Sequence, residues 1–206
     1  MDHNTGTNSG SRPGGGGFDY SHPFRSFLTT LPRVLFSPRA FFRDISNRRG
    51  FANPLVFAAT CILIGAVLSG VFGVLTRGVP GMRFLATQTG LLPTAISALV
   101  TGMIGLMIVT SVYHLLVMLL AGPHRAGLEG TFRVVSYAYA VQVLAWAPLL
   151  NILAGLYGLY LCAFGFQEIH STTYQRAATI AALPLLLLIV GGILFGILLG
   201  YFLSTG

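Results

Sequence analysis

Long apolar blocks separated by short polar connections make up most of this 206-residue chain. The first block opens at Asn53-Pro54, a cap residue followed by a proline suited to the first turn of a helix. It runs to about Leu75, and a helix of this length covers the roughly 30 Å hydrocarbon core of a bilayer. A second block runs from about Leu91 to Ala121. Apolar blocks of this length predict helices that are surrounded by lipid.

The block between Arg133 and Glu168 contains no charged residue and is too long for one straight span. Pro148 supplies a break near its middle. We therefore predict a third span over 131–147 and a fourth over 149–167. One long bent helix and a re-entrant hairpin are the alternatives.

The last block, from about Ala177 to Leu203, predicts a fifth span, and Pro184 should kink it. The predicted fold class is therefore all-α: a polytopic membrane bundle of five transmembrane helices. Small residues repeat at every fourth position within two of the spans, at Gly65, Ser69 and Gly73 and at Gly192, Gly196 and Gly200. This spacing allows close helix approach, either within one bundle or in a homo-oligomer.

The hydrophobic pattern changes in the segment that precedes the first span. Phe24, Phe27, Leu28 and Leu31 recur on one helical face, and we expect Pro32 to end this stretch. Ser37-Pro38 then reads as the start of a second short helix.

Aromatic residues flanked by arginines are typical of helices that lie in the membrane interface. Packing against the cytoplasmic end of the bundle is the alternative, and the two are compatible. The predicted membrane-interface residues are Phe24, Phe27, Arg39, Phe41, Phe42 and Arg43.

Three regions follow from these patterns. Residues 1–20 form a glycine-rich tail that we expect to be disordered. Residues 21–50 form the amphipathic segment, and residues 51–206 form the transmembrane domain. No cleavable signal peptide is visible in the first twenty residues. The two cysteines, Cys61 and Cys162, lie within apolar blocks and are interpreted as packing residues.

Composition and charge support a membrane location and indicate its orientation. Only 8% of the residues are charged, against about 25% in soluble domains. The net charge is +7, and all twelve basic residues are arginine. They cluster beside apolar spans, which favours anionic lipid headgroups over nucleic acid as the counter-charge. With five spans, most arginines share the face of the N-terminus, so the positive-inside rule places that face in the cytoplasm and the C-terminus outside. The absence of lysine suggests a GC-rich prokaryotic genome, and hence the cytoplasmic (inner) membrane.

Several pieces of the sequence, in order, resemble the prokaryotic form of the Yip domain (Ypt/Rab-interacting protein) family. They are the Ser-Pro-Arg-Ala-Phe-Phe-Arg-Asp-Ile stretch (37–45), Asn-Pro-Leu (53–55), Gly-Thr-Phe-Arg (130–133), Gly-Phe-Gln-Glu-Ile-His (165–170), and a final apolar helix with Pro184. The resemblance covers about residues 31–203. It implies five spans and a cytoplasmic N-terminus. Eukaryotic members are linked to vesicle traffic and small GTPases, but their acidic Asp-Leu-x-Gly-Pro motif is not found here, which puts a GTPase-binding role in doubt.

The sequence contains no catalytic motif, and its five acidic residues leave little material for acid–base chemistry. We therefore predict no enzyme activity, no cofactor and no metal. Polar residues inside spans still need a reason, because lipid penalises them. The candidate binding residues form a predicted cytoplasmic polar cluster: His114, Arg133, Tyr137, Glu168 and His170.

Within this cluster, a neutral His114 hydrogen-bonded inside the bundle is one interpretation. A metal or proton site with Glu168 and His170 is another, and a polar cleft for a headgroup or a partner is the third. We expect Arg133 or Arg176 to pair with Glu168, and Tyr137 to share hydrogen bonds with Glu168 or His170.

Two functions fit the pattern. The first is a non-enzymatic scaffold that binds a membrane protein partner and affects membrane organisation or trafficking. The second is a transporter, channel or lipid-moving protein that uses the polar cytoplasmic half of the bundle. A continuous polar track across the membrane would favour the second, and the non-cytoplasmic halves of the spans are almost wholly apolar, with Gln88 and Asn151 the main exceptions.

Overall fold

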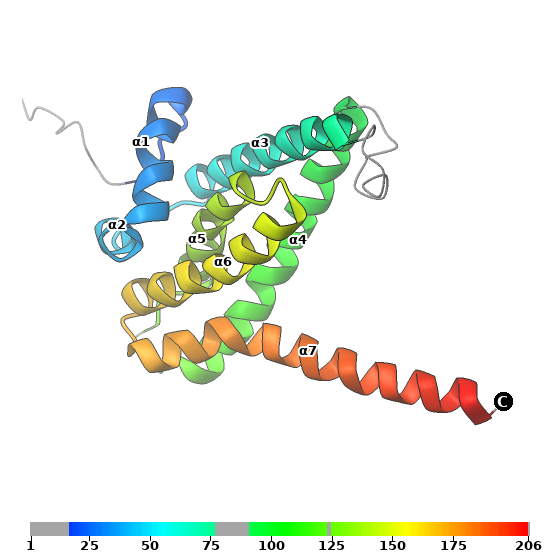
Figure 1. The fold of residues 1–206 in the computed structure, drawn as a ribbon. Coiled ribbons are helices and arrows are strands. Elements are labelled where there is room, and N and C mark those ends of the chain that lie inside the picture. The colour runs from blue at the N-terminus through cyan, green and yellow to red at the C-terminus, as the bar shows by residue number, and fades with distance from the viewer. Residues whose placement is uncertain (1–16, 77–90, 123–124, 206) are drawn as a thin grey trace, which may run out of the picture.

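The computed structural model describes residues 17–76, 91–122 and 125–205, and these residues fold into helices without strands (Figure 1). Most of the glycine-rich tail (1–16), with its predicted disorder, and the connection 77–90 lie outside the described residues. The elements are α1 (Pro23–Phe36), α2 (Pro38–Ile45), α3 (Ala52–Thr76), α4 (Leu91–Leu120), α5 (Leu128–Ala138), the 3₁₀-helix η2 (Tyr139–Val143), α6 (Pro148–Ile169) and α7 (Tyr174–Thr205).

Four of the described helices, α3, α4, α6 and α7, are long and apolar enough to cross a membrane. Their bounds differ from the predicted spans by only a few residues, because Asn53-Pro54 and Pro148 mark real helix starts. The all-α membrane class is therefore confirmed. The 11-residue α5 is not among these four helices, so the count of five stays a prediction.

Between Arg133 and Glu168 the chain forms an antiparallel hairpin. A Cβ on Gly165 would meet the side chain of Val134 at 2.5 Å, and one on Gly158 would meet Val141 at 3.5 Å. The partner residue numbers rise on one arm as they fall on the other. The chain therefore turns back after η2, near Pro148, which excludes the single long bent helix.

The first arm of this hairpin, α5 with η2, runs beside α3 in the same direction. Phe57 contacts Tyr137 near the start of α3, with ring centroids 5.1 Å apart, and Phe72 contacts Trp146 near its end, at 5.5 Å. Between these contacts Gly65 lets the two backbones meet, since a Cβ there would lie 2.4 Å from the carbonyl oxygen of Gln142. The turn after η2 therefore lies close to the far end of α3.

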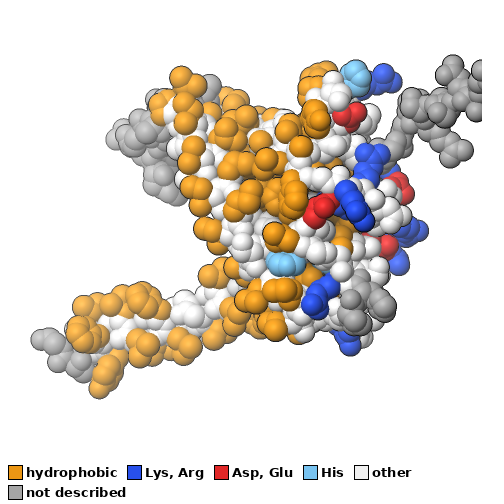
Figure 2. Space-filling model, turned by 180° about the vertical axis from the view of Figure 1, so that it is seen from behind, with side chains coloured by type: hydrophobic (Ala, Val, Ile, Leu, Met, Phe, Trp, Pro, Cys, Tyr) orange, Lys and Arg blue, Asp and Glu red, His pale blue; other side chains and the backbone are white. Residues whose placement is uncertain are grey.

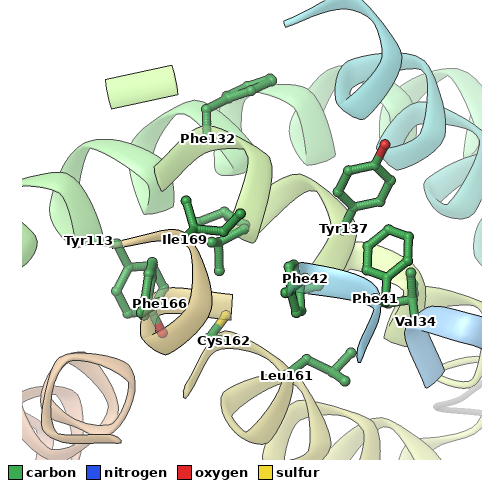
Figure 3. Packing of buried hydrophobic residues seen from close by; sticks show 14 of the residues in the cluster. Val34, Phe41, Phe42, Tyr113, Phe132, Tyr137, Leu161, Cys162, Phe166 and Ile169 are labelled. Atoms are coloured by element: carbon green, nitrogen blue, oxygen red, sulfur yellow. The ribbon is translucent and has the colours of Figure 1, made fainter. Parts of the chain in front are cut away.

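The N-terminal segment packs onto the rest of the fold through its aromatic side chains. Phe41, Phe42 and Ile45 of α2 are fully buried, and Figure 3 shows Phe41 beside Tyr137. Phe18, which the sequence assigned to the tail, is also buried because its apolar ring packs edge-on against Phe57.

Pro32 does not end the first short helix, as the sequence suggested, but lies inside α1. A proline removes its own N–H bond to the carbonyl four residues earlier and crowds it. Here that carbonyl belongs to Leu28, an exposed residue, so the helix continues to Phe36.

α7 packs on α6 near its start and then stands apart from the other helices (Figure 1). Tyr113 of α4 donates a hydrogen bond to the carbonyl of Ala181 at 3.1 Å, just before Pro184. A Cβ on Gly192 or Gly196 would meet nothing within 4 Å, so these small residues mediate no contact within the described bundle. A homo-oligomer contact through this stripe stays a prediction.

Candidate functional site

Arginine side chains gather at the end of the molecule where α1 and α2 lie, while hydrophobic side chains cover most of the remaining visible surface (Figure 2). The predicted polar cluster lies at this end, but it does not form one site. The structure distributes its five residues over four local arrangements, and each of them joins different elements.

Arg133 is 5% exposed and joins α5 to the end of α2. Its Nη1 donates to the carbonyl oxygens of Ile45 (3.1 Å) and Ser46 (3.2 Å), and its Nη2 pairs with the carboxylate of Glu129 at 2.9 Å. Glu129 also accepts the backbone N–H of Gly50, whose φ of 105° turns the chain toward α3. Arg133 thus fixes the α2–α3 connection against α5.

Tyr137 joins the N-terminal residues to the core. Its hydroxyl accepts the backbone N–H of Phe18 at 3.2 Å. Its ring packs against Phe41, with centroids 4.9 Å apart, and against Phe57. The predicted hydrogen bonds to Glu168 or His170 are not made, because Tyr137 faces α2 and α3 rather than the end of α6.

Glu168, near the C-terminus of α6, pairs with two arginines of α2. Its Oε1 lies 2.9 Å from Arg39 Nε and its Oε2 lies 3.6 Å from Arg43 Nε. The prediction that Arg133 or Arg176 pairs with Glu168 was wrong. α2 packs across α6, and its Arg39 and Arg43, one helical turn apart, therefore reach the carboxylate. These arginines offset the unfavourable position of a carboxylate at a helix C-terminus.

His114, Thr131 and His170 form a hydrogen-bonded chain that connects α4, α5 and the end of α6. The Thr131 hydroxyl lies 3.2 Å from His114 Nδ1 and 3.3 Å from His170 Nε2. Thr131 and His170 are fully buried. Burial lowers the pKa of His170 to about 4, and the nearby His114 and Arg133 act in the same direction. His170 is therefore neutral at pH 7.

The predicted metal or proton site at His114, Glu168 and His170 is not assembled. Glu168 is held by α2, whereas the two histidines are bridged by Thr131. Among the residues that the structure describes, no three His, Cys, Asp or Glu side chains come together in a group that could hold a metal. The hydrogen bonds among His114, Thr131 and His170 can instead hold α4, α5 and the end of α6 together.

The predicted interface residues fall into two sets. Phe27, Phe41 and Phe42 are buried, whereas Phe24 is 77% exposed and lies on α1. Arg39 and Arg43 are exposed although they contact Glu168. Contact of this segment with a membrane stays a prediction. The exposed apolar residues of the segment include Phe24, Leu28 and Phe36.

Sequence reasoning missed Phe18, Glu129 and Thr131 as members of these arrangements. One local signal pointed to Glu129, since it stands four residues before Arg133, the spacing of helical ion pairs. Thr131 belongs to the Gly-Thr-Phe-Arg piece, but its two histidine partners are distant in the sequence.

Comparison with protein-family models matches residues 33–204 to the Yip1 domain. Comparisons with the curated proteins and with the solved structures found no match. The match covers the last turn of α1, all of α2 to α6 and nearly all of α7, so it includes every one of the side-chain arrangements described above except the contacts of Phe18.

Proposed function

Because the chain belongs to the Yip1 domain family, we propose that it is a non-enzymatic membrane scaffold whose cytoplasmic end binds another membrane protein. The observation that carries this proposal is the firm attachment of α1 and α2 to the bundle. Glu168, Arg133 and Tyr137 all hold this segment in place through structural contacts. A partner would therefore meet the outer surface of α1 and α2.

That outer surface has the composition of a recognition site. Phe24 and Phe36 are 77% and 83% exposed, and Leu28 is exposed between them. Arg33 and Asp44 pair at 2.6 Å on the same segment, and Arg25 is exposed. Aromatic and arginine side chains are enriched at protein interfaces. Held rigidly, they would bind with little loss of conformational entropy.

A photo-crosslinking residue at Phe24 or Phe36 tests this proposal in native membranes. We expect one discrete protein adduct from these positions, and only lipid adducts from Ile104, an exposed residue of the apolar α4. Glu168→Arg should weaken the adduct, because α2 loses its ion pairs, and adding Arg39→Glu and Arg43→Glu should restore it. Crosslinking that is unaffected by Glu168→Arg would contradict a role for the attached segment.

The proposal includes five crossings of the inner membrane, with the N-terminus in the cytoplasm. Its support is that the α5–η2 arm runs beside α3 as far as Trp146, next to Phe72. The excess of arginines on the N-terminal face gives the orientation.

If the hairpin were re-entrant, the C-terminus would still lie outside, so reporters at the two termini cannot distinguish five crossings from a re-entrant hairpin. A reporter at the hairpin turn can.

Cysteine labelling with a membrane-impermeant maleimide provides that reporter. Cys61 and Cys162 are buried, so the native background should be low. We expect Ala147→Cys, at the turn, to label from outside intact cells, and Thr173→Cys, between α6 and α7, to label only after the cells are opened. Protection of both positions in intact cells would establish the re-entrant hairpin instead.

One observation favours the alternative, a lipid-moving protein. A groove of about 370 Å³ lies between α3, α4 and η2, and Ser69, Thr101 and Gln142 are among the residues that line it. Scrambling of labelled lipid by the protein in vesicles would support this alternative. It should then fall when Gln142 is changed to Leu.

A further inference from the structure

A pocket of about 150 Å³ lies where the α2–α3 connection meets α5, and none of the contacts described above fills it. Its lining includes Arg48, Arg49, Gly50, Asn53, Arg133 and Tyr137. The volume corresponds to roughly five water molecules at about 30 Å³ each. The pocket is therefore large enough for a small polar group with part of its hydration.

The arginines of this pocket differ in how they are used. Arg133 is held by hydrogen bonds to Ile45 and Ser46 and by its ion pair with Glu129. In the described part of the chain, neither Arg48 nor Arg49 has a carboxylate within ion-pair distance. The nearby Asp19 accepts the backbone N–H of Ser21 at 2.9 Å and acts on Arg48 electrostatically, without a direct ion pair. Two guanidinium groups without a direct ion pair to a described residue therefore border the pocket.

The uncharged side chains of the pocket also offer donors. Tyr137 is 3% exposed, and its hydroxyl oxygen accepts the N–H of Phe18. The hydroxyl proton makes no further hydrogen bond to the described residues, so it remains available as a donor. Asn53 accepts the N–H of Tyr20 through Oδ1, which leaves its amide NH₂ as a donor. Asn53 and Pro54 also place the pocket at the first turn of α3, which is the positive end of a helix dipole.

A site that offers two arginines, a hydroxyl proton and an amide NH₂ fits a ligand that only accepts hydrogen bonds and carries negative charge. Carboxylates and phosphates meet this description. Phosphate suits the pocket better, because its three or four oxygens can use donors that converge from several directions. The pocket also lies at Asn53 and Pro54, where the first apolar span begins, which is the depth of lipid headgroups.

We propose that this pocket binds a phosphate group. If the proposed placement of this end at the cytoplasmic leaflet holds, the source is the headgroup of an anionic phospholipid. A free phosphate ion has the same chemistry and is the second source. Arg48 and Arg49 pair with the phosphate oxygens, and Tyr137 and Asn53 donate to them. The binding would fix the start of α3 relative to the membrane surface.

The test uses the full-length protein and its thermal unfolding. Cys61 and Cys162 are buried, so a thiol-reactive dye reports their exposure as the fold opens. One arm adds inorganic phosphate to the protein in neutral detergent, at constant ionic strength to hold screening fixed. The other compares nanodiscs of phosphatidylcholine with nanodiscs that also contain phosphatidylglycerol. A ligand that binds only the folded state raises the unfolding temperature.

The decisive variant is Arg48→Gln with Arg49→Gln, and its control is Arg25→Gln with Arg176→Gln, which removes the same charge from exposed positions outside the pocket. Each charge-assisted hydrogen bond lost should weaken binding about tenfold or more. We expect stabilisation in the wild type and the control, and a loss of at least tenfold in affinity for the pocket variant. Tyr137→Phe, which keeps the ring, should weaken binding by less.

The two arms separate the sources of phosphate. Stabilisation by phosphatidylglycerol alone supports the headgroup, and stabilisation by inorganic phosphate as well supports a site for the phosphate group itself. Stabilisation by neither, or an equal response of the pocket variant and the control, would overturn the proposal. Neither arm needs a protein partner, so failure here leaves the crosslinking test of the scaffold function unaffected.

Discussion

Changing Arg133 to methionine is expected to lower the free energy of unfolding by about 3–5 kcal/mol, the range for removal of one partner from a buried ion pair. The variant keeps much of the apolar stem of the side chain but removes its donors. The carbonyl groups of Ile45 and Ser46 then lose a hydrogen bond each, and Glu129 loses its countercharge. Because these contacts fix the α2–α3 connection to α5, the N-terminal segment should loosen first.

This expectation is measured by the dye-reported thermal unfolding of the purified protein in one detergent. Arg176→Met provides the control, because Arg176 is exposed at the start of α7 and its loss should change the stability by less than about 0.5 kcal/mol. Equal unfolding temperatures for the two variants would mean that the buried contacts of Arg133 contribute nothing net.

Acidification should destabilise the protein through His170. Its side chain is fully buried, and burial lowers its pKa in the fold from 6.5 to about 4. Above pH 6.5 the imidazole is neutral in both states, and the fold keeps its full stability from this group. Between pH 6.5 and about 4 the unfolded chain takes up a proton that the folded chain excludes, so the free energy of unfolding decreases as the pH falls. The whole effect is about 3 kcal/mol.

The variant His170→Gln isolates this contribution. Glutamine does not titrate near these pH values, and its amide can still reach a hydroxyl such as that of Thr131. Other groups also titrate below pH 5, so the quantity to measure is the difference in unfolding free energy between wild type and variant from pH 7 to pH 4. That difference should move in favour of the variant by about 3 kcal/mol as the pH falls. A constant difference would show that His170 is not excluded from protonation.

Several features could be predicted because they depend on residues close in sequence. The apolar blocks predicted the four long helices. Asn53-Pro54 and Pro148 predicted the starts of α3 and α6 within a few residues, and Ser37-Pro38 predicted the start of the short α2. A proline at the first turn of a helix acts through its own backbone geometry, which needs no tertiary contact. Family membership was also readable, since it rests on the order of short pieces along the chain.

The partners of the polar residues could not be predicted. Glu168 pairs with Arg39 and Arg43, more than a hundred residues earlier in the chain, and Tyr137 meets Phe18 rather than the end of α6. Such pairings depend on how α2 lies across α6, which the aromatic side chains of α2 determine by burying themselves in the core. Helical periodicity gives the face of a helix but not the element that this face will contact.

The sequence by itself therefore determined that this protein is a helical membrane protein, where most of its helices begin and end, and the family to which it belongs. The tertiary structure alone decided that the N-terminal segment is attached to the bundle and that the predicted polar cluster separates into structural contacts. It also decided that Arg48 and Arg49 border a pocket without a direct ion pair to a described residue. The physical reason is that apolar length and backbone breaks are local properties, whereas the partner of a charged or aromatic side chain is fixed only when distant helices pack together.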